Sequence, residues 1–180
     1  MILPVYTYGE KILEKPSEIV DLNDPTLPEL ISNMFDTMRN ANGIGLAAPQ
    51  IGINKRIIVV ETKFLSSSNE EILFKEVFIN PKIISYSDYK ITTIEGCLSF
   101  PELQLSINRP LFIDVEWYNE NKVYQRKLLS ELVSIILQHE IDHLNGVLFI
   151  DKISQEEKNK FLHDLKKIKQ KKVKSKYLII

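Results

Sequence analysis

The sequence has a single cysteine in 180 residues, almost no net charge and no long hydrophobic run. Cys97 has no second cysteine to pair with, so an internal disulfide is excluded, which fits a reducing compartment. The formal net charge of -1 excludes a strong overall field that would attract the chain to DNA or to a membrane surface. No apolar stretch approaches the roughly 18 residues of a membrane span. We therefore expect neither DNA nor a membrane as a partner.

The start of the chain and its composition favour a globular protein. The first ten residues lack a basic region followed by an apolar one, unlike a signal peptide or a transit peptide. With 44% hydrophobic and 26% charged residues, the chain suits one domain with a normal core. We expect residues 1–180 to form a single cytoplasmic domain, of which residues 166–180 are a lysine-rich helix end and tail.

Hydrophobic spacing predicts an N-terminal helix followed by strands. Residues 27–41 have the spacing of an amphipathic helix, which a turn at residues 42–45 ends. Its apolar positions are Leu27, Leu30, Ile31, Met34 and Met38. Short β-branched or alternating runs predict strands, the last two of them joined as a hairpin, at residues 56–61, 77–81, 82–86, 113–118 and 123–127. Residues 64–71 are expected to form a polar surface loop.

Two helices are expected after the strands. Residues 128–137 are mostly apolar and suit a buried helix, which should end near Gly146. A last helix should begin near Ser154, which forms a capping-box pattern with Glu157, and should carry an apolar stripe of Phe161, Leu162, Leu165 and Ile168. The expected fold class is α+β, with antiparallel or mixed β-sheets around a central buried helix and with an N-terminal and a C-terminal helix.

The buried helix carries an H-E-x-x-H pattern at His139, Glu140 and His143. Each helical residue advances by about 100°, so positions i and i+4 lie on one face. Both imidazoles can then bind one metal ion, and Glu140 can reach a water in an open coordination position. The alternative is a pair of core histidines with ordinary hydrogen bonds.

A catalytic metal usually takes three protein ligands. His163 lies on the polar C-terminal helix and is expected to be exposed, and the carboxylates are too numerous to choose among. Cys97 is the better candidate, because a thiolate is a good ligand for a borderline soft metal. The residues alone leave open that Cys97 is a buried structural cysteine.

Three motifs resemble those of the peptide deformylases. They are Gly43-Ile44-Gly45-Leu46-Ala47-Ala48-Pro49-Gln50, Glu95-Gly96-Cys97-Leu98-Ser99 and Gln138-His139-Glu140-Ile141-Asp142-His143-Leu144. They occur in the family's order and at its approximate spacing, and the resemblance extends over nearly the whole chain. Two departures are small: Phe100 stands where a smaller aliphatic residue is commoner, and the loop from Lys63 to Lys75 is long.

The resemblance implies an activity and a cofactor. Deformylases remove the N-formyl group from the initiator methionine of nascent polypeptides and release formate. By this likeness Cys97, His139 and His143 hold the metal, with water as the fourth ligand. An N/S site by itself suggests zinc, whereas the family implies Fe²⁺, for which Ni²⁺, Co²⁺ or Zn²⁺ can substitute.

The resemblance also implies roles in the reaction. Glu140 would act as general base and then as general acid while the metal-bound water attacks the formyl carbon. Gln50, through its side-chain amide, and Leu98, through its backbone N–H, would stabilise the oxyanion. Further substrate-binding candidates are Gly45, which could bind the main chain, a methionine pocket of Ile44, Leu132, Ile135 and Ile136, and a Glu95–Arg109 pair near it. Asp142 is expected to be structural.

Two rival functions and one partner remain. An H-E-x-x-H metalloprotease is the alternative enzyme, although the chain has no obvious downstream glutamate or histidine motif for a third ligand. A metal-bearing module that only docks on ribosomes is the non-enzyme alternative. Residues 166–176 contain seven lysines, which read either as a solvated helix end with a loose tail or as a ribosome-docking segment near the tunnel exit.

Overall fold

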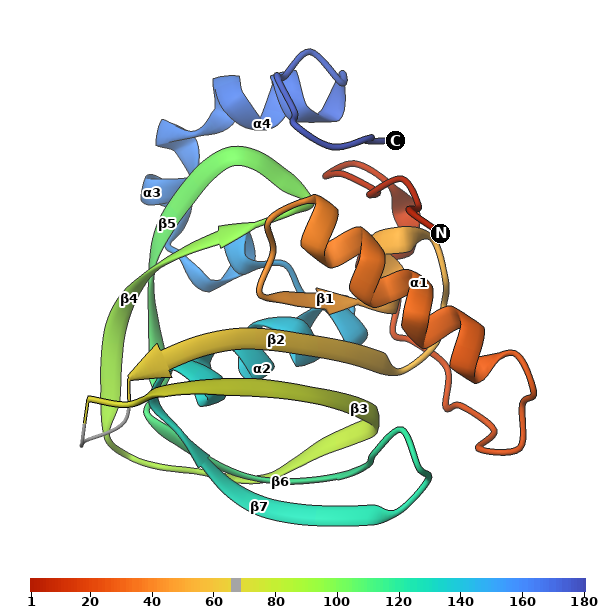
Figure 1. Ribbon diagram of the computed structural model, residues 1–180. Coiled ribbons are helices and arrows are strands. Elements are labelled where there is room, and N and C mark those ends of the chain that lie inside the picture. Colours follow the sequence, from red (N-terminus) through yellow and green to blue (C-terminus); the bar gives the residue numbers. More distant parts are fainter. Residues whose placement is uncertain (66–68) are drawn as a thin grey trace.

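The computed structural model describes residues 1–65 and 69–180, and it has a mixed α+β architecture with antiparallel sheets, as expected (Figure 1). The expected polar loop at residues 64–71 includes residues 66–68, which lie outside the described residues. In chain order the elements are η1 (Lys11–Glu14), α1 (Leu27–Asn40), β1 (Gly45–Ala47), η2 (Ala48–Ile51), β2 (Ile57–Leu65), β3 (Glu71–Tyr86), β4 (Lys90–Cys97), β5 (Phe100–Pro110), β6 (Phe112–Tyr118), β7 (Tyr124–Ser130), α2 (Glu131–Leu144), η3 (Phe149–Lys152), α3 (Gln155–Lys160) and α4 (Leu162–Lys169), where η is a 3₁₀ helix.

The strands within the described residues form two antiparallel sheets. The larger has the order β1-β2-β3-β6-β7, and the smaller pairs β4 with β5. The predicted hairpin is confirmed as β6 and β7, in which Tyr118 lies opposite Tyr124. The two strands expected at residues 77–81 and 82–86 are one strand, β3, with an irregular register between Ile79 and Lys82. Asn80 has φ +54° there, so Pro81 marks a bulge and does not end the strand.

The expected loop at residues 64–71 is too long at both ends. Strand β2 continues to Leu65, and β3 begins at Glu71, directly opposite it. Much of the long segment from Lys63 to Lys75 is therefore strand and lengthens the hairpin of β2 and β3.

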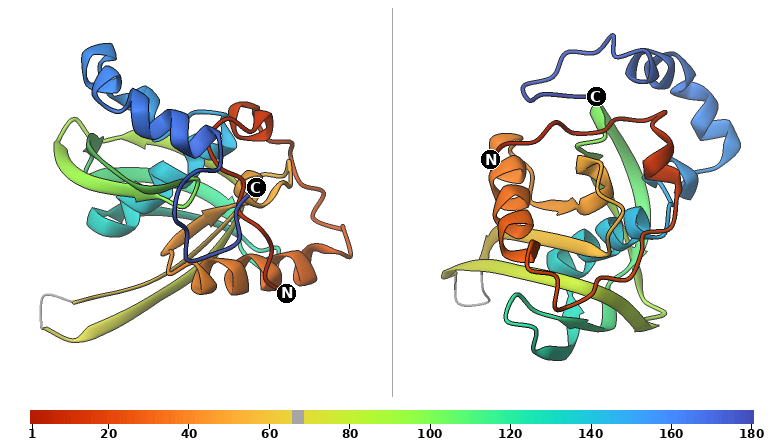
Figure 2. Two further views of the ribbon diagram at one scale, coloured as in Figure 1. Left: turned by 90° about the horizontal axis from the view of Figure 1, so that it is seen from above. Right: turned by 90° about the vertical axis from the view of Figure 1, so that its right-hand side faces the viewer.

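The elements stack in layers on both faces of the larger sheet (Figure 2). Helix α1 covers one face and packs on Ile57 and Val59, and α2 lies on the other and packs on Ile58 and Val60. All four strand residues are fully buried, so the β-branched run of β2 supplies two cores. On its other side α2 contacts β5. A third core joins β5 to η3 and α4 through Phe100, Phe149 and Leu165, among other residues.

Helix α2 begins later than its apolar run predicts. Leu128–Ser130 belong to β7, where Leu129 pairs with Ile113, and the helix begins only at Glu131. A short apolar run cannot by itself distinguish a strand from a buried helix. The predicted end near Gly146 is confirmed: Gly146 has φ +71°, and the N–H of Val147 donates to the carbonyl of Asp142.

The C-terminal region differs most from expectation. The single helix is two, because the backbone breaks at Phe161, and the break leaves Leu162 55% exposed while Leu165 and Ile168 are buried. The tail is not loose. Val5 and Ile179 form a parallel bridge, and the N–H groups of Val5 and Thr7 donate to the carbonyls of Leu178 and Ile180, both at 2.8 Å.

The sequence analysis missed the β4–β5 hairpin and the short strand β1. The residues of β4 and β5 alternate in burial, but polar residues such as Glu95 and Arg109 occupy buried positions, so the sequence does not show the alternation. No helix among the described residues is long and apolar enough to cross a membrane.

Candidate active site

Helix α2 places the two histidines of the H-E-x-x-H pattern side by side. His139 and His143 are one turn apart, both are buried, and their ring centroids are 5.1 Å apart. The Nδ1 atom of His139 lies 2.9 Å from a carboxylate oxygen of Glu95, so Nε2 is its free ligand atom. The Nε2 atom of His143 lies 3.2 Å from Sγ of Cys97. Both rings can therefore present Nε2 toward the same point.

Cys97, the last residue of β4, completes a three-ligand group. One ligand atom each from Cys97, His139 and His143 lie within 4.8 Å of one another. A thiolate and two imidazoles are donors that zinc, iron, nickel and cobalt accept. The residues present therefore fit a divalent metal with a fourth position to spare. The structure brings the three expected ligands together from β4 and α2.

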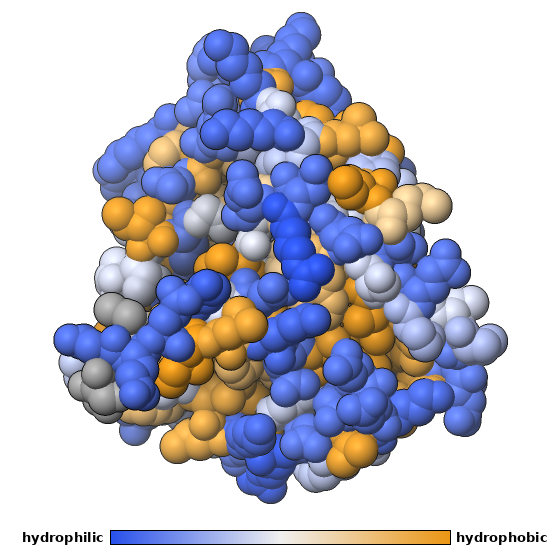
Figure 3. All heavy atoms as spheres, viewed as in Figure 1, coloured by the Kyte–Doolittle hydropathy of each residue, from blue (hydrophilic) through white to orange (hydrophobic). Residues whose placement is uncertain are grey.

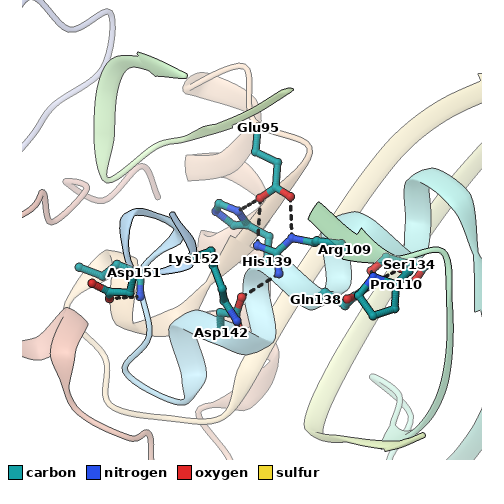
Figure 4. A network of polar contacts seen from close by, with 10 residues as sticks. Glu95, Arg109, Pro110, Ser134, Gln138, His139, Asp142, Asp151 and Lys152 are labelled. Atoms are coloured by element: carbon teal, nitrogen blue, oxygen red, sulfur yellow. Dashed lines mark hydrogen bonds and ion pairs between the residues drawn. The ribbon is translucent and has the colours of Figure 1, made fainter. Parts of the chain in front are cut away.

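A chain of charged side chains, buried at its inner end, holds His139 on the side of its Nδ1 atom (Figure 4). Arg109 donates from Nε to Glu95 at 2.5 Å and from its terminal nitrogens to Glu95 at 2.9 Å and to Asp142 at 2.8 Å. Lys152 bonds the other oxygen of Asp142 at 2.9 Å. Burial alone would raise the pKa of Glu95, but its hydrogen bonds with His139 and Arg109 outweigh burial and hold the pKa below its usual range. The predicted Glu95–Arg109 pair is confirmed.

Glu140 lies on the cleft side of α2 and has few partners. It is 5% exposed, and its Oε2 atom has no hydrogen-bond partner among the residues that the structure describes. Burial raises the pKa of Glu140 to about 7. Gly45 of β1 packs against it so closely that a Cβ atom at Gly45 would lie 2.7 Å from Oε1 of Glu140. The site thus holds a carboxyl group that can take up or release a proton near neutral pH.

Gln50 and Leu98 border the ligand group. The Oε1 atom of Gln50 accepts a hydrogen bond from the N–H of Ala47 at 2.8 Å, and this fixes which way the amide points. Its Nε2 atom lies 3.3 Å from Oγ of Ser99 and 3.7 Å from Sγ of Cys97. Leu98 directly follows Cys97 in the turn between β4 and β5, outside either strand. Both candidate oxyanion donors therefore lie beside the ligand group.

Two cavities meet at this group. One, of about 520 Å³, is lined by the four expected pocket residues Ile44, Leu132, Ile135 and Ile136, together with Glu95, His139 and Glu140. The other, of about 420 Å³, is lined by Gly45, Gln50, Cys97 and Leu98, among others. Arg109 lies behind Glu95 and lines a third cavity on the far side. His163 is exposed, as expected, and takes no part.

The sequence analysis missed two contributors. Ser99 is fully buried and accepts from Gln50, and its place beside Cys97 in the motif was a signal that could have found it. Tyr177 lines the second cavity, and its hydroxyl donates to the carbonyl of Leu98 at 2.8 Å. No local pattern points to Tyr177, since it reaches the site only through the pairing of the chain ends.

Comparison with known proteins identifies relatives over nearly the whole chain. Peptide deformylases from Christiangramia forsetii and Karelsulcia muelleri are 37% and 44% identical to it, covering 98% and 85% of this chain and 94% and 79% of theirs. The solved peptide deformylase of Ehrlichia chaffeensis matches with a TM-score of 0.85 at 33% identity, covering 96% of this chain and 97% of that one. That of Plasmodium falciparum matches with a TM-score of 0.82 at 40% identity, covering 93% and 95%. Residues 2–159 also match the family model described as polypeptide deformylase, and the chain therefore belongs to this family of metal-dependent hydrolases, which remove the formyl group from nascent polypeptides.

Proposed function

We propose that Cys97, His139 and His143 hold the catalytic metal and that Glu140 moves the protons while the formyl group of a formyl-methionyl peptide is hydrolysed to formate. The observation that carries this proposal is the convergence of three ligand atoms within 4.8 Å beside a buried carboxyl oxygen without a partner among the described residues. The helix α2, packed between the two sheets, is then the central element of one catalytic domain spanning residues 1–180, which works in the cytoplasm.

The metal is proposed to be Fe²⁺, with Ni²⁺, Co²⁺ or Zn²⁺ able to replace it. A thiolate and two imidazoles accept all four ions, so the donor set supports a divalent transition metal. Such an ion, when bound, supplies Lewis-acid chemistry and eases the deprotonation of a water molecule.

Glu140 carries out both proton transfers. Its carboxylate takes a proton from the attacking water and later gives it to the leaving amine. Burial, which raises the pKa of Glu140 to about 7, supports this exchange, because proton transfer is most effective when the pKa lies near the working pH. Gly45 supports the same role, because a side chain at this position would collide with the carboxylate of Glu140.

Gln50 and Leu98 stabilise the negative charge that develops on the formyl oxygen. The amide of Gln50 presents Nε2 toward Cys97, and the N–H of Leu98 lies outside the strand pairing. Donors that are fixed before the reaction cost little reorganisation when the charge appears. Gly45 contacts the main chain of the peptide.

The cavity of about 520 Å³ accommodates the methionine side chain, because Ile44, Leu132, Ile135 and Ile136 give it apolar walls next to Glu140. Glu95 supplies a polar part of the wall, and Arg109 holds Glu95 in place from behind. The peptide deformylase of Acinetobacter baumannii, 32% identical to this chain, was solved with Met-Ala-Ser bound. The same tripeptide in formylated form is therefore a suitable substrate for this chain.

No observation favours the metalloprotease alternative. The third ligand atom beside the two histidines is the sulfur of Cys97 on β4, which lies before the H-E-x-x-H helix in the chain. The third ligand sought for a metalloprotease was a glutamate or histidine after that helix. The module that only docks on ribosomes is likewise disfavoured, since it would not need, at the ligand group, a buried carboxyl oxygen that has no partner among the described residues.

The ribosome is proposed as a partner through the lysines of α4 and the tail. Lys166, Lys167 and Lys174 are exposed, and the region of α3 and α4 is largely hydrophilic at the surface (Figure 3). Ribosomal RNA is a polyanion, so binding should weaken steeply with salt. Replacing these three lysines with glutamine should reduce co-sedimentation with ribosomes at low salt. The same change at the exposed Lys82, Lys90 and Lys122 is the charge-matched control. Equal co-sedimentation of the two triple variants would refute docking through this surface.

The test of the activity pairs metal analysis with product formation. Protein purified without oxygen should contain about one metal ion per chain and release formate from formyl-Met-Ala-Ser. Cys97→Ser should lose both the metal and the activity, because it removes the thiolate. Met-Ala-Ser without the formyl group should remain uncleaved, and cleavage of its peptide bonds would instead support the protease alternative.

A further inference from the structure

The two ends of the chain form a brace beside the candidate active site. The N–H of Val5 donates to the carbonyl of Leu178, and the N–H of Ile180 donates back to the carbonyl of Val5, both at 2.8 Å. Lys171 adds an ion pair with Glu10 at 2.9 Å and a hydrogen bond to the hydroxyl of Thr7 at 2.8 Å. Figures 1 and 2 show the tail returning to the N-terminal segment. Residues 171–180 are thus tied to residues 5–10 at several points.

Both members of this brace hold the turn that follows Cys97. The N–H of Tyr8 donates to the carbonyl of Ser99 at 2.9 Å, and the hydroxyl of Tyr177 donates to the carbonyl of Leu98 at 2.8 Å. Gln50 holds the same turn from the third side through the hydroxyl of Ser99. Two successive carbonyls of the turn are therefore fixed by the N-terminal segment and by the C-terminal tail.

Tyr177 is suited to be a permanent donor. The Oγ atom of Ser175 accepts from the N–H of Tyr177 and donates to its carbonyl, at 3.2 Å and 2.7 Å, which fixes the backbone of the tail at this residue. A tyrosine hydroxyl keeps its proton at neutral pH, and burial raises the pKa of Tyr177 further, to about 12. Its side chain lines the cavity of about 420 Å³ that also contains Cys97 and Gln50.

We propose that Tyr177 is a positioning residue for deformylation, which acts by holding the carbonyl of Leu98 and thereby aiming the N–H of Leu98 at the formyl oxygen. This inference rests on the proposed role of Leu98. The carbonyl and the N–H of one residue are separated by two backbone rotations, and a hydrogen bond to the carbonyl restricts the one next to it. The tail lies beyond residues 2–159, the segment that the family model matches.

Removal of the Tyr177 hydroxyl should lower kcat more than it changes KM. A loosely held oxyanion donor stabilises the transition state less, while the binding of the substrate is hardly affected. We therefore expect kcat to fall and KM to change little. A neutral hydrogen bond of ordinary strength corresponds to a fall in kcat of about three- to tenfold. The ring of Tyr177 should continue to fill its place in the cavity wall when only the hydroxyl is removed.

The experiment compares Tyr177→Phe with Tyr124→Phe. Tyr124 also donates its hydroxyl to a single acceptor, Glu116 at 3.0 Å, but it lies on β7. We expect kcat for formyl-Met-Ala-Ser to fall about three- to tenfold in Tyr177→Phe only, with KM within about twofold of wild type. Hydrogen–deuterium exchange should also become faster in the peptide containing Leu98 and Ser99 in that variant alone.

Two results would overturn the inference. One is a kcat for Tyr177→Phe equal to that of wild type, and the other is a loss that the unfolded fraction at the assay temperature fully explains. Either result leaves the proposed function intact as long as wild type releases formate. If wild-type protein loaded with metal releases no formate, the proposed function itself is refuted. Hydrogen–deuterium exchange of the peptide containing Leu98 and Ser99 then still decides whether Tyr177 orders the turn.

Discussion

Glu95 and Glu140 are two buried carboxyl groups on either side of His139, yet their surroundings are opposite. Glu95 is 7% exposed and is bonded by both His139 and Arg109, and these bonds lower its pKa. Glu140 is 5% exposed, one of its oxygens has no hydrogen-bond partner among the described residues, and burial raises its pKa to about 7. A carboxylate that is fully bonded stays charged and holds its neighbours in place. One that is buried with an oxygen left without a partner can exchange a proton.

The difference arises from what the β4–β5 hairpin and strand β1 contribute beside α2. The hairpin of β4 and β5 brings Arg109 to Glu95, and Asp142 and Lys152 extend the alternation of charges to the surface (Figure 4). Strand β1 brings Gly45 to Glu140, and glycine has no side chain with which to bond it. The side of His139 that faces the β4–β5 hairpin, here called the paired side, therefore supports the metal ligand. The side that faces β1, here called the sparse side, leaves room for water and substrate.

The largest expected effect is on the sparse side. Glu140→Gln should lower kcat by about 10²- to 10⁴-fold, because the amide keeps the shape but cannot move protons. The free energy of unfolding should change little, since the substitution replaces a buried ionisable group whose Oε2 atom has no partner among the described residues. Formate release, metal content and thermal unfolding measure these outcomes. A variant with near wild-type turnover would remove Glu140 from the proposed mechanism.

The same substitution on the paired side should act through the metal and through stability. Glu95→Gln removes the charge between His139 and Arg109, so metal affinity should fall about 10- to 100-fold. Arg109, 3% exposed, would retain only Asp142 as a charged partner, so the free energy of unfolding should fall by up to about 3 kcal/mol. Competition with a chelator measures the affinity, and urea unfolding of the metal-free protein measures the stability. If Glu95→Gln lost turnover while keeping its metal and its stability, the two glutamates would not differ as proposed.

The residues on one turn of α2 could be predicted from the sequence, whereas the contacts that β4 and β5 make with this helix could not. Helical spacing suffices to place His139, Glu140 and His143 on one turn, since that geometry needs no other element. Cys97 was chosen for the chemistry of its thiolate and then for its family motif, and the approach of its sulfur to His143 depends on a hairpin that was not predicted. The buried polar residues Glu95 and Arg109 hid that hairpin, because each is tolerable inside only with the other present.

Two errors have a common physical cause. The apolar run at residues 128–130 was assigned to a helix, yet Leu129 completes β7 by pairing with β6. The lysine-rich tail was expected to be loose, yet residues 178–180 pair with residues 5–7. In both places the backbone hydrogen bonds are made with another segment of the chain, strand β6 or the N-terminal segment, and hydrophobic spacing or charge does not report them. The Tyr177–Leu98 contact was missed for the same reason.

A third prediction tests whether the sparse side depends on empty space. In Gly45→Ala the new Cβ would lie 2.7 Å from Oε1 of Glu140 and 2.9 Å from Cγ2 of Ile136. We expect the carboxylate to shift and kcat/KM to fall about tenfold, since small misplacements of reacting groups are costly. Gly96→Ala adds the same methyl group with no atom closer than 3.9 Å, so its loss should be smaller. Equal losses in the two variants would mean that the effect comes from the cleft and not from Glu140.

The smallest effect is expected at the outer end of the paired side. Asp142→Asn removes a charge from a side chain that is 16% exposed, and Lys152, its outer partner, is 36% exposed, so water can compensate for much of the change. Arg109 keeps both of its bonds to Glu95, and the asparagine oxygen can still accept from Arg109. We therefore expect the free energy of unfolding to fall by about 0.5–1 kcal/mol and metal affinity to stay within about threefold of wild type. Urea unfolding and chelator competition, run beside Glu95→Gln, give both numbers. If Asp142→Asn weakened metal binding as much as Glu95→Gln, the whole chain of charges would act on His139 as a unit. The present interpretation predicts instead that the effect fades with distance from the ring, because each charge nearer the surface is better screened.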